Sequence, residues 1–342
     1  MTVATPRAVS PARVTRVAST TRRSIRTRVW RPVREHVSAV VDPALDAEDD
    51  AEDEGLGPSS PAVAVAAHLR SESGAQRDAM VRGGALGPAP TARRVRSDAE
   101  AAEAAATLLR DGAVFLKDVA SREACDGVMT EVNEVCDSVE AVYGDALRRT
   151  DVKVGFEGAT RALVEQVIGE GGVRAILSRL DDATSEAVMV ELSVLATEKG
   201  ADRQVLHPDV SFDAPHAPLY SIFIALQDVT PSMGPTCFVL GTQDEASHDT
   251  FPMTKWGDEQ FAALIKKKCC DATLRKGDAV LYDARTFHQG GANEYGRRAL
   301  LTLTFLKPPI PAAPTRRNAN AEWSIRDDVF NAQWTLDDIV RG

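Results

Sequence analysis

Two spacings of hydrophobic residues divide the chain into a helical part and a strand-rich part. Residues 97–112, SDAEAAEAAATLLRDG, carry apolar positions at helical spacing and predict an α-helix. Ser97 is placed to cap this helix, Glu100 completes a capping box with it, and Gly112 supplies a left-handed terminator. The run AVFLKDV that follows predicts a strand, and residues 121–147 predict a second helix.

From about residue 189 the spacing changes to that of β-strands. The runs are short, rich in β-branched and aromatic residues, and separated by proline and glycine, which is typical of an antiparallel sandwich or barrel. They are VMVELSVLAT, APLYSIFIALQDV, CFVLG, DAVLYDA and RALLTLTF. Because helices come first and strands afterwards, the pattern favours an α+β fold with a sandwich core over a parallel α/β sheet.

The N-terminal part of the chain lacks such periodicity. Residues 1–34 are rich in Arg, Ser and Thr and contain no acidic residue, a composition shared by mitochondrial and chloroplast transit peptides and by disordered basic tails. The block DPALDAEDDAEDEG then reverses the sign of the charge, and a stretch rich in Gly, Pro and Ser follows. We therefore expect residues 1–90 to be a flexible extension that combines a transit peptide with an acidic linker.

The C-terminal part is separated from the strands by the proline-rich run LKPPIPAAPTRR. Trp323, Phe330 and Trp334 make the segment after it too apolar for a free tail. We expect residues 311–342 to dock on the domain or on a partner.

Composition excludes some classes of function. The chain has 342 residues, 44% of them hydrophobic and 26% charged, as in globular proteins. Its formal net charge of −10 disfavours nucleic acid as a partner, and no uncharged apolar run is long enough to predict an integral membrane segment. The five cysteines include no CxxC pair, so we interpret them as reduced thiols of an intracellular protein.

The stretch QVLHPDVSF places two ionisable residues in an apolar run of strand character. In an extended chain His207 and Asp209 project from the same face, while Pro208 points away. The pair is a candidate two-pronged ligand, and a surface turn is the alternative, since histidine, proline and aspartate are all common in turns.

A third candidate ligand lies in LRKGDAVLYDARTFHQGGAN. His288 ends the predicted strand on the face that also carries Val280 and Tyr282. Two strands then bring His207, Asp209 and His288 to one point, and two histidines with one carboxylate form the facial triad of non-haem Fe(II) oxygenases. The other histidines compete poorly: His216 lies beside prolines in a predicted loop, His248 lies in the polar stretch DEASHDT, and His36 and His68 fall in the flexible extension.

Two arginines precede the last strand and offer a cation for the carboxylate of an acidic co-substrate. Strand alternation lets only one of them face inward. The residues that share the face of Arg297 are all apolar, whereas those that share the face of Arg298 include Thr302 and Thr304. The apolar set favours Arg297 as the inward residue, and its planar fork suits a carboxylate.

Two regions together are similar to the phytanoyl-CoA dioxygenase family of Fe(II)/2-oxoglutarate-dependent oxygenases. The first is LLRDGAVFLKDVASREACDGV, and the second combines HPDVSF, LYSIFIALQDVTPSMGPTCFVLGTQ and LRKGDAVLYDARTFHQGGANEYGRRALLTLTF. The resemblance covers roughly residues 97–310. It implies a double-stranded β-helix, the cupin-like jelly roll, flanked by helices.

The resemblance also implies a reaction and its site. Iron would be held by His207, Asp209 and His288, and the distal carboxylate of 2-oxoglutarate by Arg297, with Arg298 as the alternative. Thr236, in the matching GPT, would lie in a segment that lines the site. The reaction would consume O₂ and 2-oxoglutarate, release succinate and CO₂, and hydroxylate a small molecule such as a lipid, an acyl-CoA or a specialised metabolite.

Two features of this chain bear on that reaction. Halogenating relatives carry a small residue in place of the carboxylate ligand, so Asp209 favours hydroxylation. The family commonly reads Pro-Gly-Ser-His where this chain has Leu240, Gly241, Thr242 and Gln243, which changes the expected shape of the substrate entrance.

We thus expect three parts in this chain: the extension 1–90, an oxygenase domain over 91–310 and the segment 311–342. The extension predicts chloroplast or mitochondrial import, with a cytoplasmic location as the alternative. Two other functions stay open at this point: a jelly-roll metalloenzyme that does not use 2-oxoglutarate, and a binding or scaffold protein with a vestigial ligand set.

Overall fold

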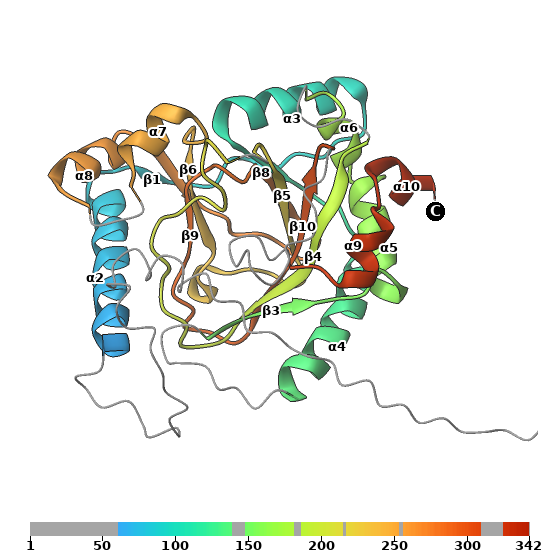
Figure 1. The fold of residues 1–342 in the computed structure, drawn as a ribbon, viewed down its shortest axis with the longest axis horizontal. Helices are drawn as coiled ribbons and strands as arrows, with labels where there is room; N and C mark the ends of the chain where they lie inside the picture. The colour runs from blue at the N-terminus through green and yellow to red at the C-terminus, as the bar shows by residue number, and fades with distance from the viewer. Residues whose placement is uncertain are drawn as a thin grey trace, which may run out of the picture.

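The structure of the protein is a computed structural model that describes residues 61–138, 148–180, 186–214, 217–252, 256–308 and 324–341. The predictions for residues 1–60, 139–147 and 309–323 and for His216 lie outside these ranges. The described chain is a mixed α+β fold with two β-sheets in its centre and helices on both sides (Figure 1).

The larger sheet has six strands. In spatial order they are β2 (Ala113–Leu116), β8 (Ala279–Asp283), β5 (Tyr220–Ala225), β10 (Arg298–Leu306), β4 (Val188–Thr197) and β3 (Arg149–Lys153). Every neighbouring pair in this sheet is antiparallel, as the strand-rich pattern of the sequence predicts. The register across β10 places Thr304 between Ser221 of β5 and Glu191 of β4.

The smaller sheet has four strands. Their order is β1 (Leu86–Gly87), β7 (Lys268–Asp271), β6 (Thr236–Leu240) and β9 (His288–Gly290). Beyond β9, His207 forms an isolated antiparallel bridge with His288, which brings the loop after β4 to the edge of this sheet. The short helix η2 (Pro231–Met233) leads into β6.

One apolar cluster joins the two sheets. It combines Phe115, Phe223 and Tyr282 from the larger sheet with Phe238 and Leu240 from the smaller one. We call this cluster the inter-sheet core. It means that the two sheets pack face to face, so residues of alternate parity on each strand point into the space between them.

Helices cover the outer faces of the sheets. Against the larger sheet lie α3 (Asp98–Asp111), α4 (Arg122–Ser138), α5 (Gly158–Ile168), α6 (Val173–Leu177), α9 (Asp327–Ala332) and α10 (Leu336–Arg341). On the side of the smaller sheet are α2 (Pro61–Arg82), α7 (Glu245–Thr250) and α8 (Asp258–Leu264) (Figure 1). The apolar cluster between the larger sheet and its helices is called the helix-side core below.

The helix predicted at residues 97–112 is confirmed as α3. The Ser97 hydroxyl accepts the N–H of Glu100 at 3.3 Å, and the Glu100 carboxylate accepts the N–H of Arg96 at 2.8 Å. Gly112 ends the helix with a φ of 73°, a left-handed conformation that costs glycine little. The caps thus fix where α3 stops and β2 begins.

Helix α2 shows that the predicted flexibility of residues 1–90 is wrong for residues 61–90. Among residues 67–82 of α2, the buried side chains are Ser73, Gln76 and Met80, which have helical spacing. Because two of the three are polar, the spacing of hydrophobic residues does not reveal this face.

Two polar contacts bind α2 to the smaller sheet and its edge. The Gln76 side-chain oxygen accepts the N–H of Leu206, the residue before His207, at 2.9 Å. Arg77 makes a bidentate ion pair with Asp271 of β7, with distances of 2.7 and 2.6 Å. The helix therefore supports the segment that carries the first candidate ligand.

The C-terminal segment 324–341 lies against the outside of β4. The Met189 N–H donates to the Trp334 carbonyl at 2.8 Å, and the Leu192 N–H donates to the Ser324 carbonyl at 3.1 Å. Phe330 is buried in the helix-side core. These residues thus extend the cover over the larger sheet.

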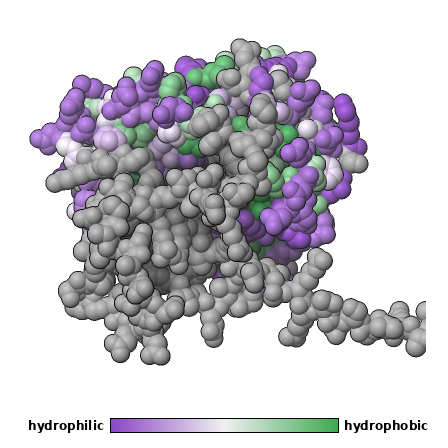
Figure 2. All heavy atoms as spheres, viewed as in Figure 1, coloured by the Kyte–Doolittle hydropathy of each residue, from purple (hydrophilic) through white to green (hydrophobic). Residues whose placement is uncertain are grey.

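The coloured part of the surface in Figure 2 is mainly hydrophilic, with small hydrophobic areas between. Large exposed hydrophobic side chains among the described residues are scattered over different elements: Val81, Leu109, Ile265, Tyr295 and Val340. Every helix in the described ranges is too short or too polar to reach across a lipid bilayer.

Candidate metal centre

Two histidines from different segments are held side by side by backbone hydrogen bonds. The N–H of His207 donates to the carbonyl of His288 at 3.0 Å, and the reverse bond is 2.9 Å long. Their ring centroids are 4.8 Å apart. Pairing across a β-bridge thus fixes both imidazoles next to each other at the edge of the smaller sheet.

The hydrogen bonds of the rings determine which nitrogen of each can bind a metal. Nδ1 of His207 lies 2.8 Å from the carbonyl of Val205, and Nδ1 of His288 lies 3.0 Å from that of Thr286. Because a carbonyl only accepts, both Nδ1 atoms carry the proton and the lone pair is on Nε2. A hydrogen bond from Nδ1 to a backbone carbonyl is the contact that commonly orients metal-binding imidazoles.

The carboxylate of Asp209 completes the cluster. Its Oδ1 lies 3.5 Å from Nε2 of His288, and its Oδ2 accepts the hydroxyl of Tyr282 at 2.7 Å. One ligand atom from each of His207, Asp209 and His288 lies within 4.8 Å of the other two. The structure therefore brings together the three residues that the sequence singled out as a facial triad.

Aromatic rings of the inter-sheet core surround His288. The ring of Phe238 stacks on it at 5.5 Å with an interplanar angle of 29°, and Tyr282 and Phe223 approach edge-on at 5.3 and 6.3 Å. Both imidazoles are buried, whereas Asp209 is exposed. The cluster is thus open on the side of the carboxylate and apolar behind the imidazoles.

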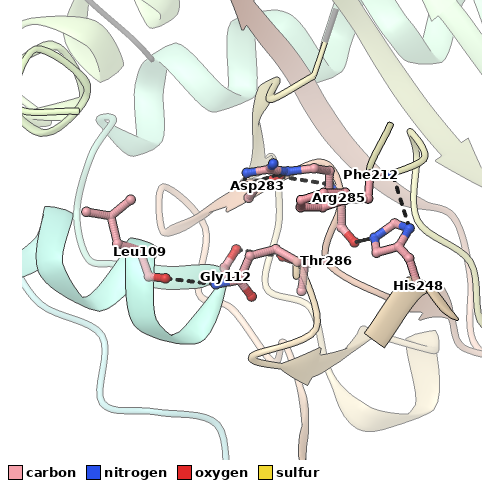
Figure 3. Close-up of polar contacts among 8 residues, drawn as sticks. Leu109, Gly112, Phe212, His248, Asp283, Arg285 and Thr286 are labelled. Atoms are coloured by element: carbon pink, nitrogen blue, oxygen red, sulfur yellow. Dashed lines mark hydrogen bonds and ion pairs between the residues drawn. The ribbon is translucent and has the colours of Figure 1, made fainter. Parts of the chain in front are cut away.

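His248 links the two segments that carry the ligands, a role that the sequence did not reveal. Its Nδ1 accepts the N–H of Phe212 at 3.2 Å, and its Nε2 donates to the carbonyl of Arg285 at 2.9 Å (Figure 3). Phe212 is three residues after Asp209, and Arg285 is three before His288. His248 lies in the short polar helix α7. Both of its partners are distant in the sequence, so only the tertiary fold reveals them.

The turn before His288 is also braced from α3. Thr286 donates to the carbonyl of Gly112 at 3.0 Å, and the Asp283 side chain accepts the N–H of Arg285 at 2.9 Å (Figure 3). Thr286 is fully buried. These contacts hold the backbone of the turn in one conformation, which pre-organises the imidazole of His288.

The structure reverses the prediction about the two arginines. Arg297 points away from the inter-sheet core and donates to Glu198 at 2.5 Å and to Asn133 of α4 at 2.7 Å. Its apolar companions on β10 pack in the helix-side core, whereas Leu300, on the face of Arg298, packs in the inter-sheet core. The alternate positions of β10 that are all apolar therefore lie on its helix-covered face, and the prediction that Arg297 faces inward is wrong.

Arg298 is the inward arginine, with 1% of its surface exposed. It donates to the carbonyl of Gly234 and to the hydroxyl of Thr197, the latter at 3.1 Å. Within the described ranges no carboxylate pairs with it, and its Nε has no hydrogen-bond partner. Burial, together with the charge of Arg149, lowers the pKa of Arg298 to about 9.

Thr236 lies between this arginine and the imidazoles. It is buried, and strand alternation places it on the same face of β6 as Phe238, whose ring stacks on His288. Gly234, which Arg298 contacts, precedes it by two residues. Inward-facing residues of the smaller sheet thus connect the guanidinium of Arg298 with the triad.

The family model described as phytanoyl-CoA dioxygenase (PhyH) matches residues 108–298, more than half of the chain. The chain belongs to the PhyH family. Among curated proteins, "Dioxygenase olcK" of Penicillium canescens is 26% identical over 238 residues, which cover 63% of this chain and 74% of that protein.

Solved structures that partly superpose on this chain include two enzymes of nogalamycin biosynthesis. The non-haem α-ketoglutarate-dependent epimerase SnoN is 21% identical, has a TM-score of 0.49, and is matched over 64% of this chain and 94% of its own. The carbocyclase SnoK is 18% identical with a TM-score of 0.48, over 68% of this chain and 92% of its own.

As a PhyH protein, the chain is a 2-oxoglutarate-dependent non-haem iron dioxygenase that uses Fe(II), 2-oxoglutarate and O₂. Its own residues fit these groups. Two imidazoles with the lone pair on Nε2 and one carboxylate suit Fe(II), and a buried guanidinium without a described carboxylate partner suits a dicarboxylate co-substrate.

The departure from the usual PhyH sequence at residues 240–243 has a structural role here. The Thr242 hydroxyl donates to the carbonyl of Val239 at 2.6 Å and accepts the N–H of Phe287 at 3.0 Å. The Gln243 side chain donates to the carbonyl of Leu109 at 2.8 Å. Both residues therefore brace the backbone beside His288 instead of offering a further ligand.

Proposed function

We propose that this protein hydroxylates a small molecule, with iron held by His207, Asp209 and His288. The observation that carries the proposal is the convergence of their three ligand atoms within 4.8 Å. When bound, the iron would supply the oxidation that couples decarboxylation of 2-oxoglutarate to insertion of oxygen into a C–H bond.

Arg298 is proposed to bind the distal carboxylate of 2-oxoglutarate. A buried guanidinium that lacks a described carboxylate partner gains a charge-assisted, two-pronged hydrogen bond when a carboxylate enters. The hydroxyl of Thr236 lies on the line between Arg298 and His288, so we assign it to the wall of the same co-substrate pocket.

Residues around the proposed iron site favour hydroxylation, exclude water and leave one side open for the substrate. Asp209 supplies the third ligand and fills the position that a halide would need, which supports hydroxylation over halogenation. The rings of Phe223, Phe238 and Tyr282 exclude water from the inner side of the imidazoles. The open side next to Asp209 is where the substrate would enter.

We further propose that the two sheets are the halves of a double-stranded β-helix. The antiparallel pairing in the larger sheet, the shared inter-sheet core and the position of the ligands at the edge of the smaller sheet support this assignment.

The proposed function is tested first by binding and then by turnover. Anaerobic addition of Fe(II) and 2-oxoglutarate should give a weak visible charge-transfer band in the unchanged protein and none in His207→Ala. His68→Ala is the matched control, because His68 is exposed on α2. No band in the unchanged protein would contradict the proposed ligands.

Turnover is then measured with a metabolite library, reading succinate and product mass together. A product heavier by one oxygen atom, formed with equimolar succinate, supports hydroxylation. A product of unchanged mass formed with succinate would instead indicate another outcome of the same chemistry. Turnover that needs the metal but not 2-oxoglutarate would contradict the assignment of Arg298.

A further inference from the structure

The two imidazoles of the proposed metal centre are held in the same way by the backbone that precedes each of them. Nδ1 of His207 lies 2.8 Å from the carbonyl of Val205, and Nδ1 of His288 lies 3.0 Å from the carbonyl of Thr286. In both cases the acceptor is two residues before the histidine. The direction of each ring therefore depends on the direction of one carbonyl group.

Each of these two carbonyls belongs to a peptide unit whose N–H is bound by a side-chain oxygen. The N–H of the first unit, from Leu206, donates to Oε1 of Gln76 at 2.9 Å. The N–H of the second unit, from Phe287, donates to Oγ1 of Thr242 at 3.0 Å. Because a peptide unit is planar, an oxygen that fixes its N–H also fixes the direction of its carbonyl.

The two oxygens are buried and come from outside the segments that carry the ligands. Gln76 is 1% exposed on α2, and Thr242 is 0% exposed in the loop after β6. The hydroxyl of Thr242 gives its only proton to the carbonyl of Val239 at 2.6 Å, so a lone pair faces the N–H of Phe287. The side-chain oxygen of Gln76 can only accept. Because bulk water reaches neither side chain, each oxygen holds its peptide unit in one orientation.

We propose that Gln76 is a positioning residue that fixes the tautomer and the ring orientation of His207. Thr242 has the same role for His288. A carbonyl held toward Nδ1 keeps the proton there and leaves the lone pair of Nε2 for the metal. Both roles rest on the proposed function of the two histidines as ligands, and both residues act only through a peptide unit.

The β-bridge between the histidines limits how far each effect spreads. Two backbone hydrogen bonds join His207 to His288, so the two held peptide units lie on either side of one bridge. A change in one unit should therefore appear at its own histidine first and at the other by a smaller amount. Gln76 also precedes residues 108–298, the range that the family model matches, so the metal centre of this chain extends beyond that range.

The tautomers are read directly by nitrogen-15 NMR of the full chain without metal, labelled at histidine. At about pH 8.5, where free imidazole is neutral, the nitrogen shifts separate a proton on Nδ1 from a proton on Nε2. Signals are assigned with His207→Gln and His288→Gln. We expect both rings of the unchanged protein to carry the proton on Nδ1. A proton on Nε2 of either ring would overturn the role of its positioning residue.

Gln76→Met removes the acceptor and keeps the length of the side chain, so the buried N–H of Leu206 loses its partner. We expect His207 to become a mixture of both tautomers, and Co(II), used in place of Fe(II), to bind about tenfold more weakly. Gln76→Glu keeps an oxygen that accepts in either protonation state and should restore both readouts. Ser73→Ala is the matched control, because Ser73 is equally buried on α2 and donates to a carbonyl of its own helix.

Thr242→Val makes the corresponding change at the second ring. It removes the hydroxyl and keeps the shape of the side chain, so His288 should show the tautomer mixture and His207 the smaller change. Thr242→Ser keeps the hydroxyl and should bind Co(II) as tightly as the unchanged protein. Urea unfolding of each variant gives its stability. A loss of stability with both tautomers and the Co(II) affinity unchanged would show a purely structural role and contradict the proposal.

The outcomes distinguish this inference from the proposed function. If the unchanged protein binds Co(II) no more tightly than Asp209→Ala, the proposed metal site fails, while the spectra without metal still decide the positioning roles. If it binds Co(II) through the triad but neither Gln76→Met nor Thr242→Val changes a tautomer, the positioning roles are wrong. Should a variant not fold, the tautomer of the corresponding ring in the unchanged protein decides.

Discussion

Exchanging the adjacent arginines for methionine, one at a time, tests the co-substrate site. Arg298→Met removes the buried guanidinium between the sheets, and Arg297→Met removes its neighbour, which pairs with Glu198 outside. Two charge-assisted hydrogen bonds to a carboxylate contribute about 1.5–3 kcal/mol each, so Arg298→Met should weaken 2-oxoglutarate binding roughly 100-fold or more. A partly exposed ion pair contributes about 0–1 kcal/mol to stability, and Arg297→Met should leave the affinity unchanged.

Without co-substrate, Arg298→Met should stabilise the folded protein instead of weakening a function. Lowering the pKa of Arg298 from 12.5 to about 9 corresponds to about 5 kcal/mol of penalty for the charged form. Methionine removes this penalty but also loses the bonds to Gly234 and Thr197. We therefore expect Arg298→Met to raise the free energy of unfolding by about 1–4 kcal/mol, the range found when buried ion pairs are replaced by well-packed hydrophobic residues.

Calorimetric titration of the Co(II)-loaded protein gives the affinities, and urea unfolding without metal or 2-oxoglutarate gives the stabilities. The reasoning would be refuted if Arg298→Met bound 2-oxoglutarate as tightly as the unchanged protein. It would also be refuted if Arg297→Met lost the affinity, because the inward and outward faces of β10 would then be assigned the wrong way round.

Four further predictions concern stability, positioning and the N-terminal part. Burial raises the pKa of Glu191 to about 8 and also raises that of Asp151, so the folded state binds more protons than the unfolded state. The free energy of unfolding should therefore fall between about pH 4.5 and 8. Urea titration should show this fall in the unchanged protein and a smaller one in Glu191→Gln. His248→Ala should weaken Co(II) binding about tenfold, since it releases both ligand segments, while His68→Ala should not, measured by titration. Removing residues 1–60 should keep a folded protein and removing 1–90 should not, judged by circular dichroism, because α2 would be lost. Fluorescent protein fused to residues 1–60 should enter an organelle if they form a transit peptide, and a cytosolic signal would contradict import.

The ligand set was predictable because it depends on short-range geometry. A two-residue spacing in an extended chain brings His207 and Asp209 to one side. The prediction that His288 ends the strand of Tyr282 is wrong, because β8 ends at Asp283 and a turn carries the chain into the smaller sheet, where His288 begins β9. The pairing that joins the two segments, by contrast, is a contact between residues 81 positions apart, which the local spacing of residues does not determine.

The choice between the arginines failed for a physical reason. A strand with one face in solvent has a single apolar set, which marks the inside. All nine residues of β10 are buried, because helices cover one face and the other sheet covers the second. The more apolar set then faces the helices, and the face with Thr302 and Thr304 forms the functional interior. Helix α2 was missed for the related reason that its buried stripe is largely polar.

Two buried cysteines beneath helix α2 make the detachment of this helix measurable by chemical labelling. The thiols of Cys237 and Cys269 lie with Met80 of α2 in one apolar cluster, and burial raises the pKa of Cys269 to about 12 and that of Cys237 well above its usual value. Such thiols have almost no thiolate at neutral pH and react slowly with alkylating reagents. Each release of α2 from the sheet would expose them to alkylation, so labelling rates would record how often the support beneath Leu206 and His207 opens.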